Sequence, residues 1–133
     1  MRMLLITACL ALVAAVPAPA LAVVNPIIVN IQPIAPNGPR GKVSFFQLGS
    51  DVVVNVTLDR EQSGTQSAGI RRGSCKSLAP QAQWNVVSVS GTQQTTRLPN
   101  VELNQLLGHA FVVNATQNQS SPVIGCADIR DVD

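Results

Sequence analysis

Short runs rich in β-branched residues, separated by turn signals roughly every ten positions, constrain the fold of this chain more than any other feature. In the clearest run, VVVNVTL at 52–58, apolar residues alternate with Asn55 and Thr57 at a period of two. That period places one face of a strand in a core. No segment has the pattern of a long amphipathic helix. The sequence therefore predicts an all-β sandwich or barrel of roughly six to eight short strands.

Several other stretches fit the same pattern and are joined by turn residues. We expect strands at 42–48, 84–90, 110–116 and 123–129, and a Thr-rich strand with a turn at 91–99. Residues 59–74 are polar and glycine-rich and are predicted to form a long loop, and residues 117–122 form a shorter one. Residues 101–107, followed by Gly108, are compatible with one or two helical turns or with an irregular strand entry.

Residues 1–22 have the three parts of a secretory signal peptide. Arg2 gives a positive start, an uncharged apolar run follows at 4–16, and the small-x-small triplet ALA at 20–22 is a cleavage site. The apolar run is shorter than the ~20 residues that span a bilayer. A signal anchor and a lipid-modified Cys9 are therefore the weaker alternatives. We expect a secreted or periplasmic mature protein without a membrane span.

The stretch that follows the signal, residues 23–40, is rich in proline. Proline fixes φ and has no backbone donor, so this stretch is predicted to be an extended N-terminal arm before a domain at 41–133. Its isoleucines and valines are unusual for a free linker. Two alternatives follow from them: an edge strand lying on the domain, or an exposed arm that binds a partner.

Cleavage of the signal would remove Cys9 and leave two cysteines, Cys75 and Cys126. An even number of cysteines in an exported protein indicates a disulfide bond. The chain-entropy model assigns about 4 kcal/mol of stability to a bridge that closes a loop of this size. The alternative is a pair of unpaired buried thiols.

The composition excludes several classes of function. Charged residues make up 12% of the chain and the formal net charge is only +2, so the basic excess that neutralises nucleic-acid phosphates is missing. The same apolar composition argues against charge-driven disorder. A single histidine, His109, is present, which excludes any metal site made of several histidines and makes Ser/His or Cys/His catalysis difficult to build.

Five stretches, through their order, their spacing and the two cysteines, resemble the copper/zinc superoxide dismutases and their short bacterial exported relatives. They are GKVSFFQ at 41–47, VVVNVTL at 52–58, GIRRGSC at 69–75, GHAFVVN at 108–114 and GCADI at 125–129. The resemblance implies a Greek-key β-sandwich, or flattened barrel, of about eight strands. It also implies that Cys75 pins a long loop to the last strand through Cys126.

The same resemblance implies that the family's metal site has been lost. The family binds copper through imidazoles, and the resemblance places three of these ligands at Gly69, Arg71 and Asn114. Glycine has no side chain, arginine is a cation without a lone pair to donate, and asparagine offers only a neutral amide oxygen. The bridging and zinc-binding histidines would lie within residues 76–100, which contain neither His nor Asp. No catalytic, cofactor-binding or metal-binding residue of the family is therefore expected.

His109 remains as a weak metal candidate. Asn114, Asp128 and the two cysteines are its only conceivable companions, and a disulfide would remove the thiolates. A structural or surface role is the ordinary interpretation of a lone histidine.

Arg71, Arg72 and Lys76 form a small basic cluster on the predicted long loop. Such a cluster is usually a solvated face. The functional interpretation is a contact for an anion or for an acidic partner.

Together these observations predict an exported, disulfide-pinned, superoxide dismutase-like β-sandwich that has lost its copper/zinc site. It would serve as a non-catalytic binding or structural module for an unknown protein or surface ligand, without nucleic acid as a partner. One alternative is a copper-handling protein or superoxide dismutase that uses an unrecognised metal site, or one shared across a homodimer through His109. Another is an inhibitor or host-facing module that binds through its loops.

Overall fold

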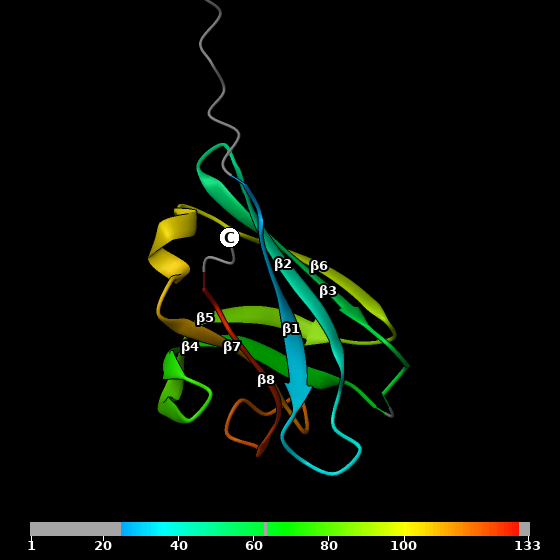
Figure 1. Cartoon of the computed structure of the whole chain (residues 1–133). Coiled ribbons are helices and arrows are strands. Elements are labelled where there is room, and N and C mark those ends of the chain that lie inside the picture. The colour runs from blue at the N-terminus through cyan, green and yellow to red at the C-terminus, as the bar shows by residue number, and fades with distance from the viewer. Residues whose placement is uncertain (1–24, 63, 131–133) are drawn as a thin grey trace, which may run out of the picture.

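The structure is a computed structural model that describes residues 25–62 and 64–130. The predicted signal peptide lies outside the described residues. The strands are β1 (Ile27–Pro33), β2 (Gly41–Leu48), β3 (Asp51–Leu58), β4 (Gln66–Ser74), β5 (Ser77–Val89), β6 (Gln93–Leu98), β7 (His109–Asn114) and β8 (Val123–Asp128) (Figure 1). A single turn of 3-10 helix, η1 (Leu103–Leu106), precedes β7. The predicted all-β fold is confirmed.

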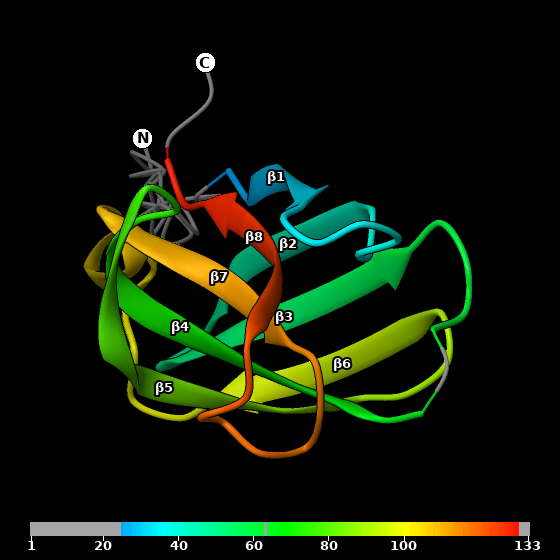
Figure 2. The same cartoon turned by 90° about the horizontal axis from the view of Figure 1, so that it is seen from below.

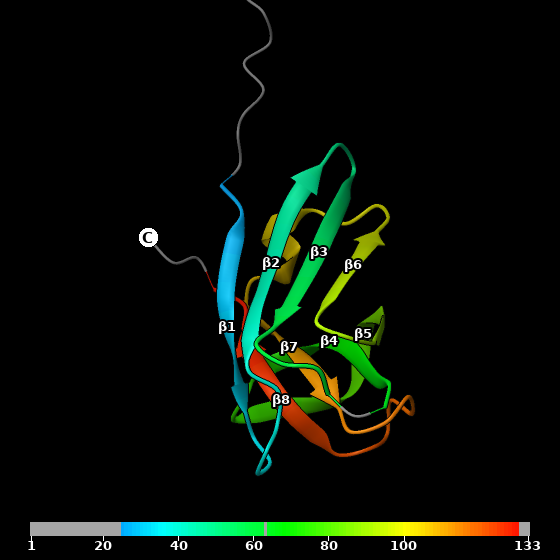
Figure 3. The same cartoon turned by 90° about the vertical axis from the view of Figure 1, so that its right-hand side faces the viewer.

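The strands form one antiparallel sheet in the order β5-β4-β7-β8-β1-β2-β3-β6. The sheet curls on itself, so that its end strands β5 and β6 lie next to each other (Figure 2). From the side, β2, β3 and β6 form one half, and β4, β5, β7 and β8 form the other (Figure 3). Because β7 pairs with β4 rather than with β6, the chain makes a Greek-key connection.

The core lies between the two halves of the curled sheet. Val52, Val54 and Val56 of β3 are fully buried, while Asn55 and Thr57 face away from the core, as the period of two predicts. Phe45 of one half packs edge-to-face on Phe111 of the other, with ring centroids 6.3 Å apart. This aromatic contact joins the halves at the centre of the core.

The predicted long loop at 59–74 is wrong from residue 66 onward, because Gln66–Ser74 forms β4, an inner strand of the sheet. The low strand propensity of this polar, glycine-rich run is overcome by backbone pairing with both β5 and β7. The following strand also starts earlier than expected, at Ser77. Gly73 supports the tight connection between these strands, since its φ of +93° suits glycine and a Cβ there would collide with the Ser77 carbonyl.

The N-terminal stretch is not a free arm but lies on the domain as β1, which pairs with β2 alone over Ile27–Ile31, as an edge strand does, and with β8 at Gln32 and Pro33. Ile27, Val29 and Ile31 of β1 are buried in the core, and β1 pairs with both β2 and β8. The prolines do not interrupt the backbone pairing of β1 with β2, because Pro26 precedes the strand and Pro33 ends it.

The two cysteines form a disulfide bond, with their Cα atoms 5.9 Å apart and 51 positions between them in the sequence. Cys75 lies in the turn after β4, and Cys126 lies in β8. The bridge belongs to a small apolar cluster outside the main core, which also contains Ala110, Val112 and Leu78. It therefore ties the turn between β4 and β5 to the outer face of β7 and β8.

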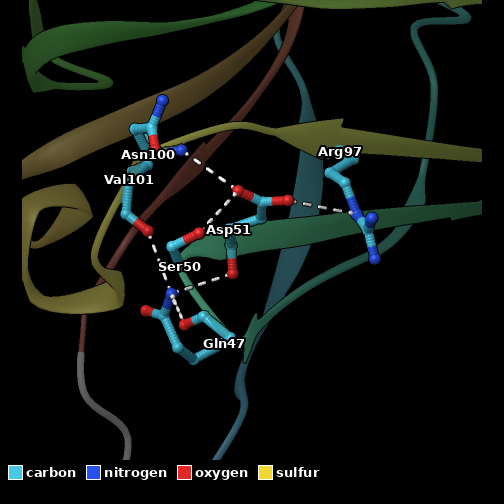
Figure 4. A network of polar contacts seen from close by, with 7 residues as sticks. Gln47, Ser50, Asp51, Arg97, Asn100 and Val101 are labelled. Carbon is cyan, nitrogen blue, oxygen red and sulfur yellow. Dashed lines mark hydrogen bonds and ion pairs between the residues drawn. The ribbon is translucent and has the colours of Figure 1, made fainter.

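A second connection, made by the amide of Gln47, ties β2 to the loop before η1 (Figure 4). Its Nε2 donates to the carbonyl oxygens of Asp51 at 2.8 Å and Val101 at 3.0 Å, and its Oε1 accepts from the backbone of Leu103 at 2.8 Å. Beside it, Asp51 makes an ion pair with Arg97 at 3.5 Å. One glutamine amide thus satisfies several backbone groups at the entry to η1.

Removing the disulfide should lower the stability of the fold strongly. We expect Cys75→Ser with Cys126→Ser to lower the free energy of unfolding by about 4 kcal/mol, because the unfolded chain regains the entropy of a long loop. This corresponds to a fall of about 15 °C in the Tm of a domain of this size. Thermal unfolding of the mature protein with and without reductant measures the effect, and an unchanged melting curve would contradict it.

The Gln47 connection predicts a second, smaller loss. Gln47→Ala should lower the free energy of unfolding by about 2 kcal/mol, since Asp51, Val101 and Leu103 each lose a hydrogen-bond partner. Gln93→Ala is the matched control, because this glutamine is exposed and its amide has no hydrogen bond to a described residue. The control should stay within about 0.5 kcal/mol of the wild type in urea unfolding. Equal losses in the two variants would refute the role given to Gln47.

Candidate functional site

Three positions singled out in the sequence come together on the outer face of β4 and β7. Ile70 is fully buried in the core, so its neighbours Gly69 and Arg71 lie on the opposite face of the strand. Asn114 ends β7, which pairs with β4. Nη2 of Arg71 donates to Oδ1 of Asn114 at 3.2 Å. The structure therefore brings Arg71 and Asn114 into direct contact, although 43 positions separate them in the sequence.

Gln119, a residue that sequence reasoning missed, joins these positions from the loop between β7 and β8. Its carbonyl oxygen accepts from Nη2 of Arg71 at 3.1 Å, and its Oε1 accepts from Nδ2 of Asn114 at 3.3 Å. Its Nε2 donates to the carbonyl of Ala68 at 3.0 Å. A glutamine in a polar loop carries no signal that could have identified it. We call Arg71, Asn114 and Gln119 the Arg71 cluster.

Gly69 leaves the space that the Arg71 cluster uses. A Cβ at this position would lie 3.3 Å from Oε1 of Gln119 and 2.9 Å from the Cβ of Ala82. The first distance is tighter than an ordinary van der Waals contact, and the second requires a shift of β5 relative to β4. Absence of a side chain at Gly69 therefore allows loop 115–122 to pack down on β4.

The Arg71 cluster holds a buried positive charge among neutral groups. Arg71 is only 8% exposed, and both partners of its Nη2 are amide oxygens. Nε of Arg71 is fully enclosed and has no hydrogen-bond partner among the described residues. Within the described part of the chain, the one ion pair joins Arg97 to Asp51, and no carboxylate approaches Arg71.

The residues present do not fit a copper or zinc ion. The three positions supply a hydrogen atom, a guanidinium and a neutral amide, whereas these metals need imidazole, thiolate or carboxylate ligands. A guanidinium would also repel a divalent cation, most strongly where the dielectric is low. Across residues 25–62 and 64–130, no group of three or more His, Cys, Asp or Glu side chains lies close enough to hold a metal.

The predicted basic cluster does not form one patch. Arg71 is buried, whereas Arg72 is exposed and donates from Nε to Oε1 of Gln83 at 3.1 Å. Both arginines lie on β4 rather than on a loop, and Lys76 lies in the turn after it. The neighbouring arginines therefore occupy contrasting environments, one enclosed and one in solvent.

His109 lies at the start of β7, and it belongs to no group of three or more His, Cys, Asp or Glu side chains among the described residues. Its ring packs on Trp84 with centroids 5.1 Å apart. Nδ1 lies 3.3 Å from the carbonyl oxygen of Leu107, and Nε2 lies 3.2 Å from Oε1 of Gln83. Both ring nitrogens thus face a protein oxygen.

A groove of about 590 Å³ lies where β1 and β8 diverge, because these strands pair only at Gln32 and Pro33. The disulfide forms part of its lining, together with Asp128. Two exposed isoleucines, Ile28 and Ile34, flank it. Asp128 accepts a hydrogen bond from the backbone N–H of Cys75 at 2.7 Å, which fixes the carboxylate beside the bridge.

Two further findings bear on identity. No helix in the part of the chain that the structure describes has the length and apolar character needed to cross a membrane. Comparison with protein-family models, with curated proteins and with solved structures finds no match to this chain.

Proposed function

We propose that this protein is an exported β-sandwich related to the copper/zinc superoxide dismutases, that it has lost their metal site, and that it acts as a non-catalytic binding or structural module. The contact between Arg71 and Asn114 carries the proposal. These residues stand at two positions where the resemblance implies copper ligands. The contact between them supports the alignment with this family, because two ligands of one metal ion must lie close together. Neither side chain can replace an imidazole as a copper ligand, which argues against superoxide dismutase activity.

The surroundings of this contact support the same conclusion. The Nη2 hydrogens of Arg71 are directed to the oxygens of Asn114 and Gln119, so the guanidinium occupies the space between strand and loop. Gly69, the third position, lies against Gln119 as well. Because the Arg71 guanidinium is fixed there by two hydrogen bonds, the oxygens it holds are not available to a metal ion, which its positive charge would also repel.

The disulfide supports export and a role that depends on a persistent shape. Disulfide bonds form and persist mainly in oxidising compartments, and the bridge here braces the outer face of β7 and β8. With the signal-like segment at 1–22, it favours a secreted or periplasmic protein. A rigid sandwich with loops at its ends is a frequent scaffold for binding.

The metal content of the mature protein tests this proposal. We expect protein purified from its export compartment without chelator to contain far less than one copper or zinc ion per chain. We also expect no superoxide dismutase activity in the same sample, because the ligand positions hold no imidazole. Stoichiometric copper with dismutase activity would overturn the proposal and favour a site at His109 shared across a dimer, which His109→Ala would then abolish.

Restoring imidazoles tests the alignment itself. Arg71→His with Asn114→His and Gly69→His should create binding of one cupric ion per chain, because three imidazoles would then share one face. Ala82→Gly should accompany them, since the Cβ of Ala82 lies 2.9 Å from a Cβ at position 69. The control carries Ala82→Gly with Arg72→His, which places a histidine on the solvent-exposed neighbour. Equal copper binding by both folded variants, measured by calorimetry, would show that the alignment is wrong.

A further inference from the structure

The buried charge of Arg71 lacks a counter-charge within the described chain. A guanidinium in a protein stays positively charged and offers five N–H donors. Here the hydrogen bonds come from Nη2 alone, and their acceptors are the neutral oxygens of Asn114 and Gln119. Nε is enclosed without a partner, and Nη1 donates to no described residue. Burial of a charge in this state is strongly unfavourable unless an opposite charge compensates it.

The described acids are placed elsewhere. Asp51 is the partner of Arg97, and Asp128 accepts from the backbone of Cys75. Asp59, Glu61 and Glu102 are exposed. The compensating charge at Arg71 is therefore not supplied by the described residues.

The surroundings limit the size of a compensating ligand. Gln119 and its loop cover Arg71 from one side, and Ala82 of β5 lies close to Gly69 on the other. The amide of Asn114 is also engaged, because its Nδ2 donates to Gln119. Nε is enclosed, so the donor left for a ligand is Nη1 of Arg71. Its position suits one small, singly charged group that accepts hydrogen bonds, and a halide and a carboxylate share that chemistry.

We propose that Arg71 binds a small monovalent anion on the outer face of β4 and β7. The anion is either free, as chloride is, or the carboxylate of an acidic side chain on a partner protein. It neutralises the guanidinium and so favours the packing of loop 115–122 on the sheet. This site does not depend on the relation to superoxide dismutases, because it follows from the charge and contacts of Arg71 alone.

Thermal unfolding in exchanged salts tests the proposal. Sodium chloride replaces sodium isethionate at constant ionic strength, so that general screening does not change and the reference anion is a bulky sulfonate that is neither a halide nor a carboxylate. Above the dissociation constant, the Tm of the mature protein should rise by about 5 °C for each tenfold increase in chloride. A second series with sodium formate replaces chloride by the smallest carboxylate. A rise with chloride identifies a free anion, and a rise with formate alone identifies a carboxylate from a partner.

Two variants locate the site. Arg71→Gln removes the buried charge, and its Tm should not depend on either anion. Arg72→Gln is the matched control, because it removes the exposed arginine one position along the same strand, and it should follow the wild type. A wild-type Tm that is flat in both salts overturns the proposal. An Arg71→Gln variant that responds as the wild type does overturns it as well.

The linewidth of ³⁵Cl in nuclear magnetic resonance decides the case if Arg71→Gln does not fold. A chloride ion held by the protein relaxes faster than free chloride, so the mature wild-type protein should broaden the resonance. Formate should reverse the broadening by competition. Arg72→Gln should broaden it equally. Absence of any excess broadening by the wild type, in a sample that formate also fails to stabilise, overturns the anion site.

Discussion

The pairing of β1 with two different strands is the constraint on which the rest of the structure depends. Residues Ile27 to Ile31 pair with β2, and Gln32 and Pro33 pair with β8. One strand thus joins the half that contains β2, β3 and β6 to the half that contains β4, β5, β7 and β8. Because the halves face each other, the apolar side of each strand meets the other half, as in the contact of Phe45 with Phe111.

This arrangement also determines where polar chemistry can lie. Ile70 of β4 faces the core. Because side chains alternate along a strand, its neighbours Gly69 and Arg71 lie on the outer face. That face is covered in two places, by the disulfide-linked turn at Cys75 and by the loop that holds Gln119. Arg71 therefore lies outside the main core but is still buried. The segments that pack over the outer face of the sheet enclose its charge.

The strands with clear alternation could be predicted from the sequence, whereas those stabilised by neighbours could not. β3 has β-branched residues at a period of two and was found by pattern alone. β4 is glycine-rich and polar, and only its pairing on both edges makes it a strand. In the candidate site, Arg71 and Asn114 were identified through a resemblance. Gln119 was not, because a long-range contact of a loop amide leaves no local pattern.

A guanidinium and a metal ion have one structural property in common, which is that each draws several oxygen atoms around a positive charge. Arg71 draws Oδ1 of Asn114 and the carbonyl oxygen of Gln119 toward one nitrogen. Because these oxygens come from β7 and from the loop after it, the cation ties together segments that neutral packing would leave loosely joined. In this chain, an arginine fixes the loop at 115–122 to the outer face of the sheet.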